Sequence, residues 1–224
     1  MRSDTRQSGS GDSISLALSY TLERLNGVTL PEIEALRMDM LVEQLDRAAL
    51  DRYVDATQML GAAPGAQPGD AMEQLGAAVY GMLAGSPTLT LEPVSCRVDG
   101  EPAEARVTLQ VDGENLPPPA SLFAGDSAAW RSVLSGAGRL ALSEPLAQRT
   151  AEGLMLSQLR ANTPADSKVT DAQLQTMARQ QSQAMLAGLL HQGMLVREGQ
   201  MVHSEFDYER GALSINGQAM PMLR

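Results

Sequence analysis

Two short Gly-Asp-Ser segments, Gly11-Asp12-Ser13 and Gly125-Asp126-Ser127, are the first places where this sequence could carry chemistry. One class of serine hydrolases has its nucleophile in such a segment, and that class also needs an Asp three residues before a late His. Neither His191 nor His203 has an Asp at that position. A serine hydroxyl is a poor nucleophile without a base that takes its proton. We therefore interpret Ser13 and Ser127 as turn or capping residues.

The second candidate is an alternating run near the end of the chain. His203, Glu205 and Asp207 are two residues apart, so on a strand their side chains would project from one face and could form a metal or acid–base patch. An alternating strand with one solvated face accounts for the pattern without a site. We therefore favour a solvated face over a site. On the opposite face of the strand, Val202, Phe206 and Tyr208 would cover the core.

The remaining polar groups are not arranged as a site. The carboxylate pairs Glu32/Glu34 and Asp51/Asp55 are typical of solvated faces, and Lys168 has no glycine-rich turn before it. One Cys and two His cannot build a closed zinc site of Cys and His ligands. We expect His191 to be a helix cap or surface residue. The sequence therefore predicts no catalytic, cofactor-binding or metal-binding residues, and a protein that is not an enzyme.

The composition excludes further classes. The 224 residues contain 17 Lys and Arg against 27 Asp and Glu, a net charge of -10, which argues against nucleic-acid binding. Cys96 is the single cysteine and cannot form an internal disulfide. No run approaches the ~20 apolar residues of a membrane span. The 13 methionines recur on apolar faces of the expected helices and strands. We interpret them as core residues; the alternative is a Met-lined groove that binds a lipid or a peptide.

The elements that would position these residues alternate between hairpins and helices. Residues with a period of two predict strands, and residues with helical spacing after Ser, Thr or Asp caps predict helices. Tight turns between the strands favour antiparallel pairing, with helices packed on one face of a curved sheet, which is an α+β class. The expected strands are 14–22, 36–42, 89–98, 107–111, 140–142, 202–208 and 213–215. The expected helices are 46–59, 70–85, 127–134, one that begins at 143–145, and 170–192.

The domain organisation follows from the same pattern. Residues 1–12 are polar and rich in Ser and Gly, so we expect a disordered leader. Residues 13–221 are expected to form a single α+β domain. Segments 61–69 and 86–88 contain the Gly and Pro residues at which the domain could be sub-divided.

Three segments, taken in order, resemble a known family. They are Leu45-Asp46-Arg47-Ala48-Ala49-Leu50, Gly193-Met194-Leu195-Val196-Arg197-Glu198-Gly199 and Gly211-Ala212-Leu213-Ser214-Ile215-Asn216-Gly217-Gln218. Together they resemble the YdgA-like family of bacterial proteins of unknown function, over about residues 14–220. The resemblance implies a Gram-negative envelope protein with an N-terminal membrane anchor and a large periplasmic region. This chain would correspond to its C-terminal half, and the resemblance supplies no catalytic residues.

The leading hypothesis is therefore a non-enzymatic, periplasm-facing envelope domain that binds a lipid-like ligand or a protein partner on an apolar sheet face or groove. One alternative is a hydrolase acting on envelope material through Ser127 or the His203 face. The other is a structural module whose edge strands complete a larger sheet. The sequence leaves the identity of the ligand or partner and the oligomeric state open.

Overall fold

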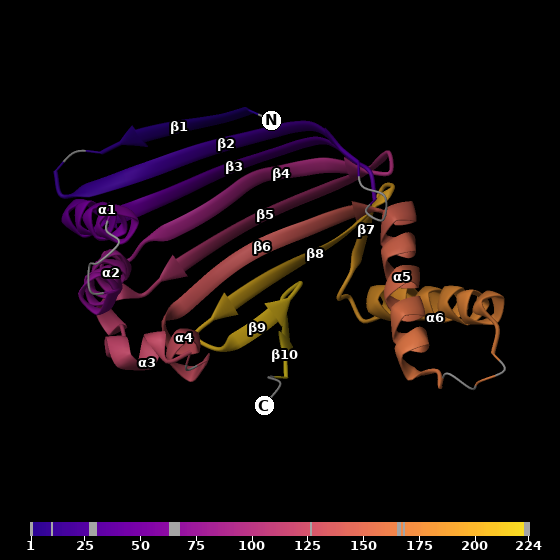
Figure 1. Cartoon of the computed structure of the whole chain (residues 1–224). Coiled ribbons are helices and arrows are strands. Elements are labelled where there is room, and N and C mark those ends of the chain that lie inside the picture. Colours follow the sequence, from indigo (N-terminus) through magenta and orange to yellow (C-terminus); the bar gives the residue numbers. More distant parts are fainter. Residues whose placement is uncertain are drawn as a thin grey trace.

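The structure, a computed structural model, describes residues 2–9, 11–26, 31–62, 68–125, 127–164, 167 and 169–221. Within these residues the main element is one antiparallel sheet of ten strands, not closed into a barrel (Figure 1). Nine strands follow the order β1-β2-β3-β4-β5-β6-β8-β9-β10, and β7 pairs beside β8. The strands are β1 (Arg2–Ser8), β2 (Ser13–Leu25), β3 (Ile33–Asp46), β4 (Thr88–Val98), β5 (Glu101–Val111), β6 (Leu134–Ser143), β7 (Val196–Glu198), β8 (Met201–Glu209), β9 (Ala212–Ile215) and β10 (Gln218–Met220).

Six α-helices and one 3-10 turn stand between the strands of the described chain. They are α1 (Arg47–Ala62), α2 (Pro68–Ala84), η1 (Gly113–Asn115), α3 (Pro119–Phe123), α4 (Ser127–Val133), α5 (Glu144–Asn162) and α6 (Asp171–His191). The predicted α+β class is confirmed. The sheet is a long meander in which strands close in sequence pair, some through short turns, such as β4 with β5 and β8 with β9, and others through helical connections, such as β3 with β4 and β5 with β6.

The strand interiors follow the alternation of the sequence. In β2 and β3, Leu18 lies opposite Met40 and Tyr20 opposite Met38, so apolar residues from both strands share one face. The register between β4 and β5 shifts between Leu91 and Val94, an irregularity that contains Pro93. This shift keeps Val94 on the same face as Leu91.

Local capping signals set the helix ends. The Asp46 side chain accepts a hydrogen bond from the Ala49 N–H at 2.7 Å, at the start of α1. Thr170 and Gln173 form the reciprocal capping box of α6, in which the Thr170 N–H donates to Gln173 Oε1 at 2.8 Å. The helix ends at His191, just before Gly193, whose φ of 71° favours glycine. The starts of α1 and α6 agree with the expected helices 46–59 and 170–192.

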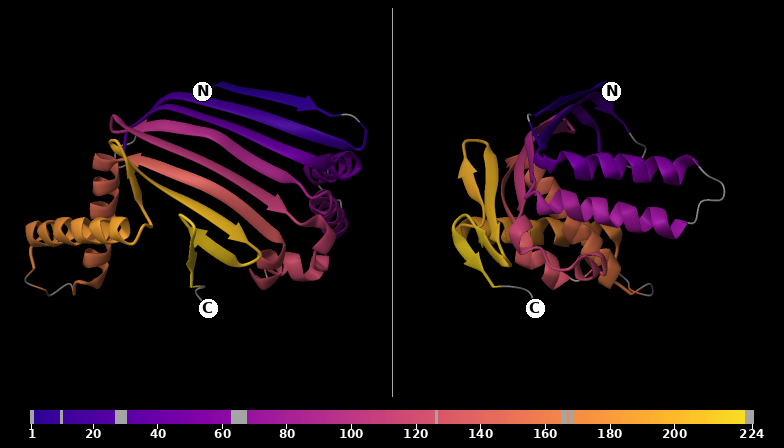
Figure 2. Two further views of the ribbon diagram at one scale, coloured as in Figure 1. Left: turned by 180° about the vertical axis from the view of Figure 1, so that it is seen from behind. Right: turned by 90° about the vertical axis from the view of Figure 1, so that its left-hand side faces the viewer.

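The helices are grouped at the two ends of the sheet and stand on the same face of it (Figure 2). At one end, α1 and α2 pack against each other and on β3, with α3 and α4 beside them. At the other end, α5 and α6 pack together, and α5 contacts β5, β6 and β8. The largest fully buried side chains of the α1–α4 end are Ile14, Leu122 and Val133. No helix in the described part of the chain has the length and apolar character that a membrane span requires.

Several boundaries differ from the sequence predictions. Residues 2–8 form strand β1, paired along β2, where a disordered leader was expected. Residues 2–8 pair with β2 through backbone hydrogen bonds, and such pairing does not require apolar side chains in β1. Strand β6 spans ten residues and is longer than the predicted 140–142, because its glycines interrupt the apolar alternation. Of the predicted break at 61–69, residues 61, 62, 68 and 69 are helical and 63–67 lie outside the described residues.

Candidate functional site

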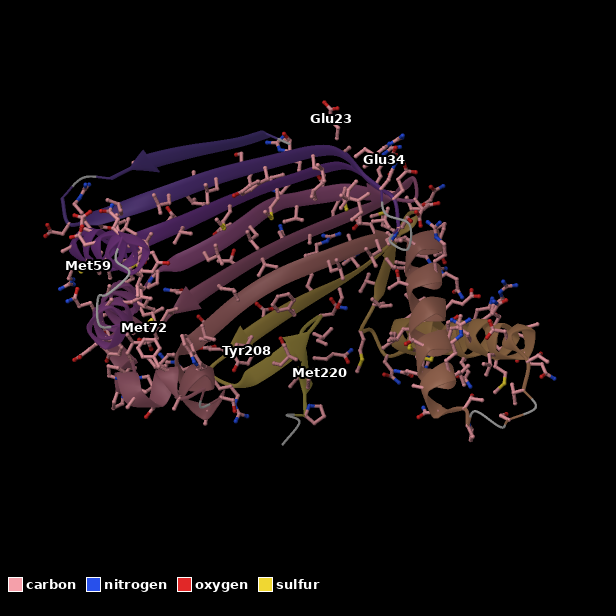
Figure 3. The ribbon with its side chains drawn as sticks, in the orientation of Figure 1. Glu23, Glu34, Met59, Met72, Tyr208 and Met220 are labelled. Atoms are coloured by element: carbon pink, nitrogen blue, oxygen red, sulfur yellow. The ribbon has the colours of Figure 1, made fainter. Side chains whose placement is uncertain are left out.

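One face of the sheet is apolar along almost its whole width. Residues directly opposite each other in an antiparallel pair point to the same face, so the register defines rows that cross the strands. One row consists of Leu18, Met40, Leu91, Val107, Gly138, Phe206 and Ile215. The next row consists of Leu16, Val42, Leu89, Leu109, Gly136, Tyr208, Leu213 and Met220. We call this side of the sheet, which consists of the two rows and the residues next to them on the same side, the apolar face. Tyr208 and Met220 lie near its β10 end (Figure 3).

The apolar face is covered at its ends and open between them. At the α1–α4 end, Ile14 and Val133 are each 1% exposed. In the middle of the face, Met40 and Val107 are only half-buried, and Leu109 is 39% exposed. No helix of the described chain crosses this central region (Figure 1). A contiguous exposed apolar surface framed by covered ends is typical of an interaction or ligand-binding site.

A pocket of about 190 Å³ lies where the apolar face meets α5 and α6. We call it the α5 pocket. The sheet, both helices and the segment after α6 contribute to it. Its lining residues are Leu140, Leu142, Ala147, Thr150, Ala151, Leu154, Met185, Leu186, Leu195, Val202 and Ser204. None of these residues is charged, and the Thr150 hydroxyl already donates to the Leu146 carbonyl at 2.9 Å. The pocket therefore offers hydrocarbon and sulfur contacts and almost no hydrogen bonding.

Cys96 also lies on the apolar face. It lies opposite Ala103, one strand away from Leu142 of the α5 pocket. Burial raises the pKa of the Cys96 thiol above its ordinary value, because desolvation disfavours the thiolate. The single thiol of the chain is therefore a neutral, weakly polar member of the apolar face.

The opposite face of the sheet is polar and carries ion pairs. Arg139 contacts Glu198 at 2.9 Å and Glu205 at 3.6 Å, and Arg106 is 3.9 Å from Glu205. Such exposed pairs contribute little stability. A depression of about 480 Å³ on this face is lined by acidic, basic and neutral side chains together, including Glu92, Glu104, Arg106 and Arg139. Because its charges already neutralise one another, it does not select one ligand chemistry.

The structure places the predicted His203 patch on this polar face. The His203 side chain is 12% exposed, and its Nδ1 has no hydrogen-bond partner among the described residues. The nearest carboxylate oxygen, Glu198 Oε2, is 3.7 Å away, beyond hydrogen-bond distance. Among the described side chains, no three His, Cys, Asp or Glu are arranged to hold a metal ion.

The two candidate serines lie far from His203. Ser127 begins α4, beside the Leu134 end of β6, whereas His203 pairs with Ala141 near the other end of that strand. Seven strand residues separate these positions, a length of about 23 Å. Ser13 pairs with Asp46, at the α1 end of the sheet. The structure thus brings neither serine to a histidine. Asp126 and Lys168 lie outside the described residues.

The other carboxylates and the second histidine are surface groups. Arg24 lies between the paired carboxylates and forms ion pairs with both Glu32 and Glu34. Asp51 and Asp55 are exposed on α1. His191 is the exposed last residue of α6, in the last turn as predicted.

Sequence reasoning expected an apolar face, but it missed the residues that turn one end of this face into a pocket. Leu154, Met185 and Leu186 come from two helices and meet Leu140 of β6 only in the folded chain. A partial signal was present, since Ala147, Ala151 and Leu154 recur at helical spacing on one side of α5.

The fold and the site together define an open antiparallel α+β protein with a candidate binding face and no assembled catalytic group among its described residues. The chain belongs to the family described as bacterial protein of unknown function, DUF945, whose family model matches residues 1–222. No curated protein and no solved structure matches the chain. The family match confirms a bacterial domain of unknown function. The YdgA-like name and the C-terminal placement within a longer protein stay predictions.

Proposed function

We propose that this chain is a non-enzymatic binding domain of the bacterial envelope that faces the periplasm and holds the hydrocarbon part of a lipid-like ligand on the apolar face. The observation that carries the proposal is the continuity of the two apolar rows across seven and eight strands, with half-buried residues such as Met40, Leu91 and Val107 at the centre. The envelope location rests on the YdgA-like resemblance of the sequence.

The chemistry of the face favours hydrocarbon over an extended peptide. The backbone N–H and C=O groups beneath the face are already paired in the ladders of the sheet. An extended segment laid on this face would therefore bury its own polar backbone without partners, which costs several kcal/mol per unsatisfied group in an apolar environment. An acyl chain carries no such groups. It would contact the rows by burial and dispersion alone.

The test compares two adjacent residues of β5 that point to opposite faces. Val107 is at the centre of the apolar face, and Thr108 is exposed on the polar face. We expect delipidated wild-type protein to bind cis-parinaric acid, a linear fluorescent fatty acid with a free methyl end, with a rise in fluorescence. Val107→Asp should weaken this binding by about tenfold or more, because a carboxylate would have to be desolvated against the acyl chain. Thr108→Asp is the matched control and should bind like the wild type.

Circular dichroism of both variants establishes that the sheet is retained. Native mass spectrometry of the wild-type protein supplies a second readout that needs no substitution. If the delipidated wild type takes up no fatty acid and the freshly purified protein carries no lipid, the proposal is wrong. Equal loss of binding in Val107→Asp and Thr108→Asp would also contradict it, because the ligand would then not distinguish the two faces.

A further inference from the structure

The α5 pocket differs from the rest of the apolar face because it has walls on more than one side. Leu140 and Val202 of the sheet form its floor, while Leu154 of α5 and Leu186 of α6 stand over it. Val202 is buried at 5% exposure, whereas Leu140 and Leu154 are 49% and 51% exposed. The pocket thus has a closed inner side and an apolar, open mouth.

The mouth of the pocket is continuous with the centre of the apolar face. Leu140 lies opposite Ala105 of β5, and Ala105 lies opposite Val94 of β4. Val94 in turn lies opposite Met38 of β3. This row of apolar residues gives an uninterrupted hydrocarbon path across four strands from the pocket to Met38.

Charge and size restrict what the pocket can hold. Because no lining residue is charged and the lining is almost entirely hydrocarbon, the pocket favours an apolar group over a charged lipid headgroup or a carboxylate. A peptide segment is excluded for the same reason, since its amides would lose their partners. A dry cavity of about 150 Å³ holds a benzene-sized ligand, so about 190 Å³ accommodates a short stretch of alkyl chain.

We propose that the α5 pocket receives the methyl end of a linear acyl chain, whose remaining carbons lie along the row toward Met38. This inference rests on the proposed function and adds an orientation to it. The polar end of the ligand is then held away from α5 and α6, on or beyond the open part of the apolar face. A rigid or polycyclic hydrocarbon would not follow the row and enter the pocket.

The methionines of the chain provide the readout. Met185 lines the α5 pocket, Met38 and Met40 lie on the open apolar face, and Met59 and Met72 lie on α1 and α2 at the other end (Figure 3). The 224-residue protein labelled with [methyl-¹³C]methionine is mixed with stearic acid that carries a doxyl spin label at carbon 16 or at carbon 5. Loss of each methyl signal then measures its proximity to that carbon. Met185→Leu assigns the critical resonance.

We expect the carbon-16 label to attenuate the Met185 signal at least threefold more than the carbon-5 label does, and the carbon-5 label to act more strongly on Met38 or Met40. The opposite order, or equal effects on Met185, would overturn the inferred orientation while the effect on Met38 and Met40 still supported binding on the apolar face. Attenuation of no methyl group would overturn both proposals. Uniform attenuation that includes Met59 and Met72 would show non-specific association and would also count against both.

A variant that narrows the pocket gives an independent check. Ser204 lines the pocket from β8 and lies opposite Leu140, and a strand position accepts an aromatic side chain well. In Ser204→Phe we expect the selective effect of the carbon-16 label on Met185 to disappear, with the effects on Met38 and Met40 retained. If Met185 is still attenuated selectively in a folded Ser204→Phe protein, the methyl end does not occupy the pocket.

Discussion

Phe206 of β8 lies directly opposite Gly138 of β6, and its ring fills the space where a side chain at position 138 would begin. A Cβ at position 138 would come within 2.5 Å of Phe206 Cε1. The aromatic ring thus covers the glycine on the apolar face, an arrangement that stabilises glycine-containing strands. It keeps the centre of this face apolar although β6 contributes no side chain there.

This contact predicts that Gly138→Ala destabilises the protein by about 1–3 kcal/mol, because the ring or the strand must move. Equilibrium urea unfolding measures the change. The matched control is Gly153→Ala in the exposed middle of α5, where nothing lies within 4 Å of a new Cβ. That substitution should stabilise the protein by about 0.5–1 kcal/mol, because alanine favours a helix interior over glycine. Equal effects of the two substitutions would contradict the steric interpretation.

A second prediction concerns the residue that joins β6 to α5. Ser143 is 3% exposed, accepts the Leu146 N–H at 3.2 Å and donates to Glu101 Oε2 at 2.8 Å. Ser143→Ala leaves both partners without their hydrogen bond and should cost about 1–2 kcal/mol in urea unfolding. Thr170→Ala removes the exposed cap of α6 and should cost less. A cost for Ser143→Ala no larger than that for Thr170→Ala would show that the part-buried hydrogen bond to Glu101 adds nothing.

Such caps were predictable because their partners are close in sequence. The Thr170–Gln173 box, the Asp46 cap and the two-residue alternation of β2 and β3 each lie within one short segment. Alternation also predicted that His203, Glu205 and Asp207 would share a face, and the register confirms this. The class of the fold could be predicted for the same reason.

The remaining features depend on contacts between distant segments. The α5 pocket unites Leu140 with Met185, 45 positions further along the chain, and no periodicity indicates which helix covers which strand. Strand β1 has the sequence RSDTRQS, in which no alternation of apolar residues marks a strand. Its place follows from pairing with β2, a backbone interaction that side-chain patterns do not encode.

The third prediction uses Cys96 as a sensor of the apolar face. Because burial raises the pKa of its thiol, less thiolate is present near neutral pH than in the unfolded chain, and the thiolate is the reactive form. At pH 8 we expect iodoacetamide to alkylate Cys96 more slowly in the native protein than in urea.

The raised pKa of the Cys96 thiol also affects stability. The neutral thiol favours the folded state below the unfolded pKa, and this contribution is lost as the pH rises through the folded pKa. Wild-type stability should therefore fall at alkaline pH more than that of Cys96→Ala, as urea unfolding at pH 7 and pH 10 would show. A native alkylation rate equal to the unfolded rate would contradict the alkylation prediction, because the thiol would then be as accessible and as ionised in the folded protein as in the unfolded chain.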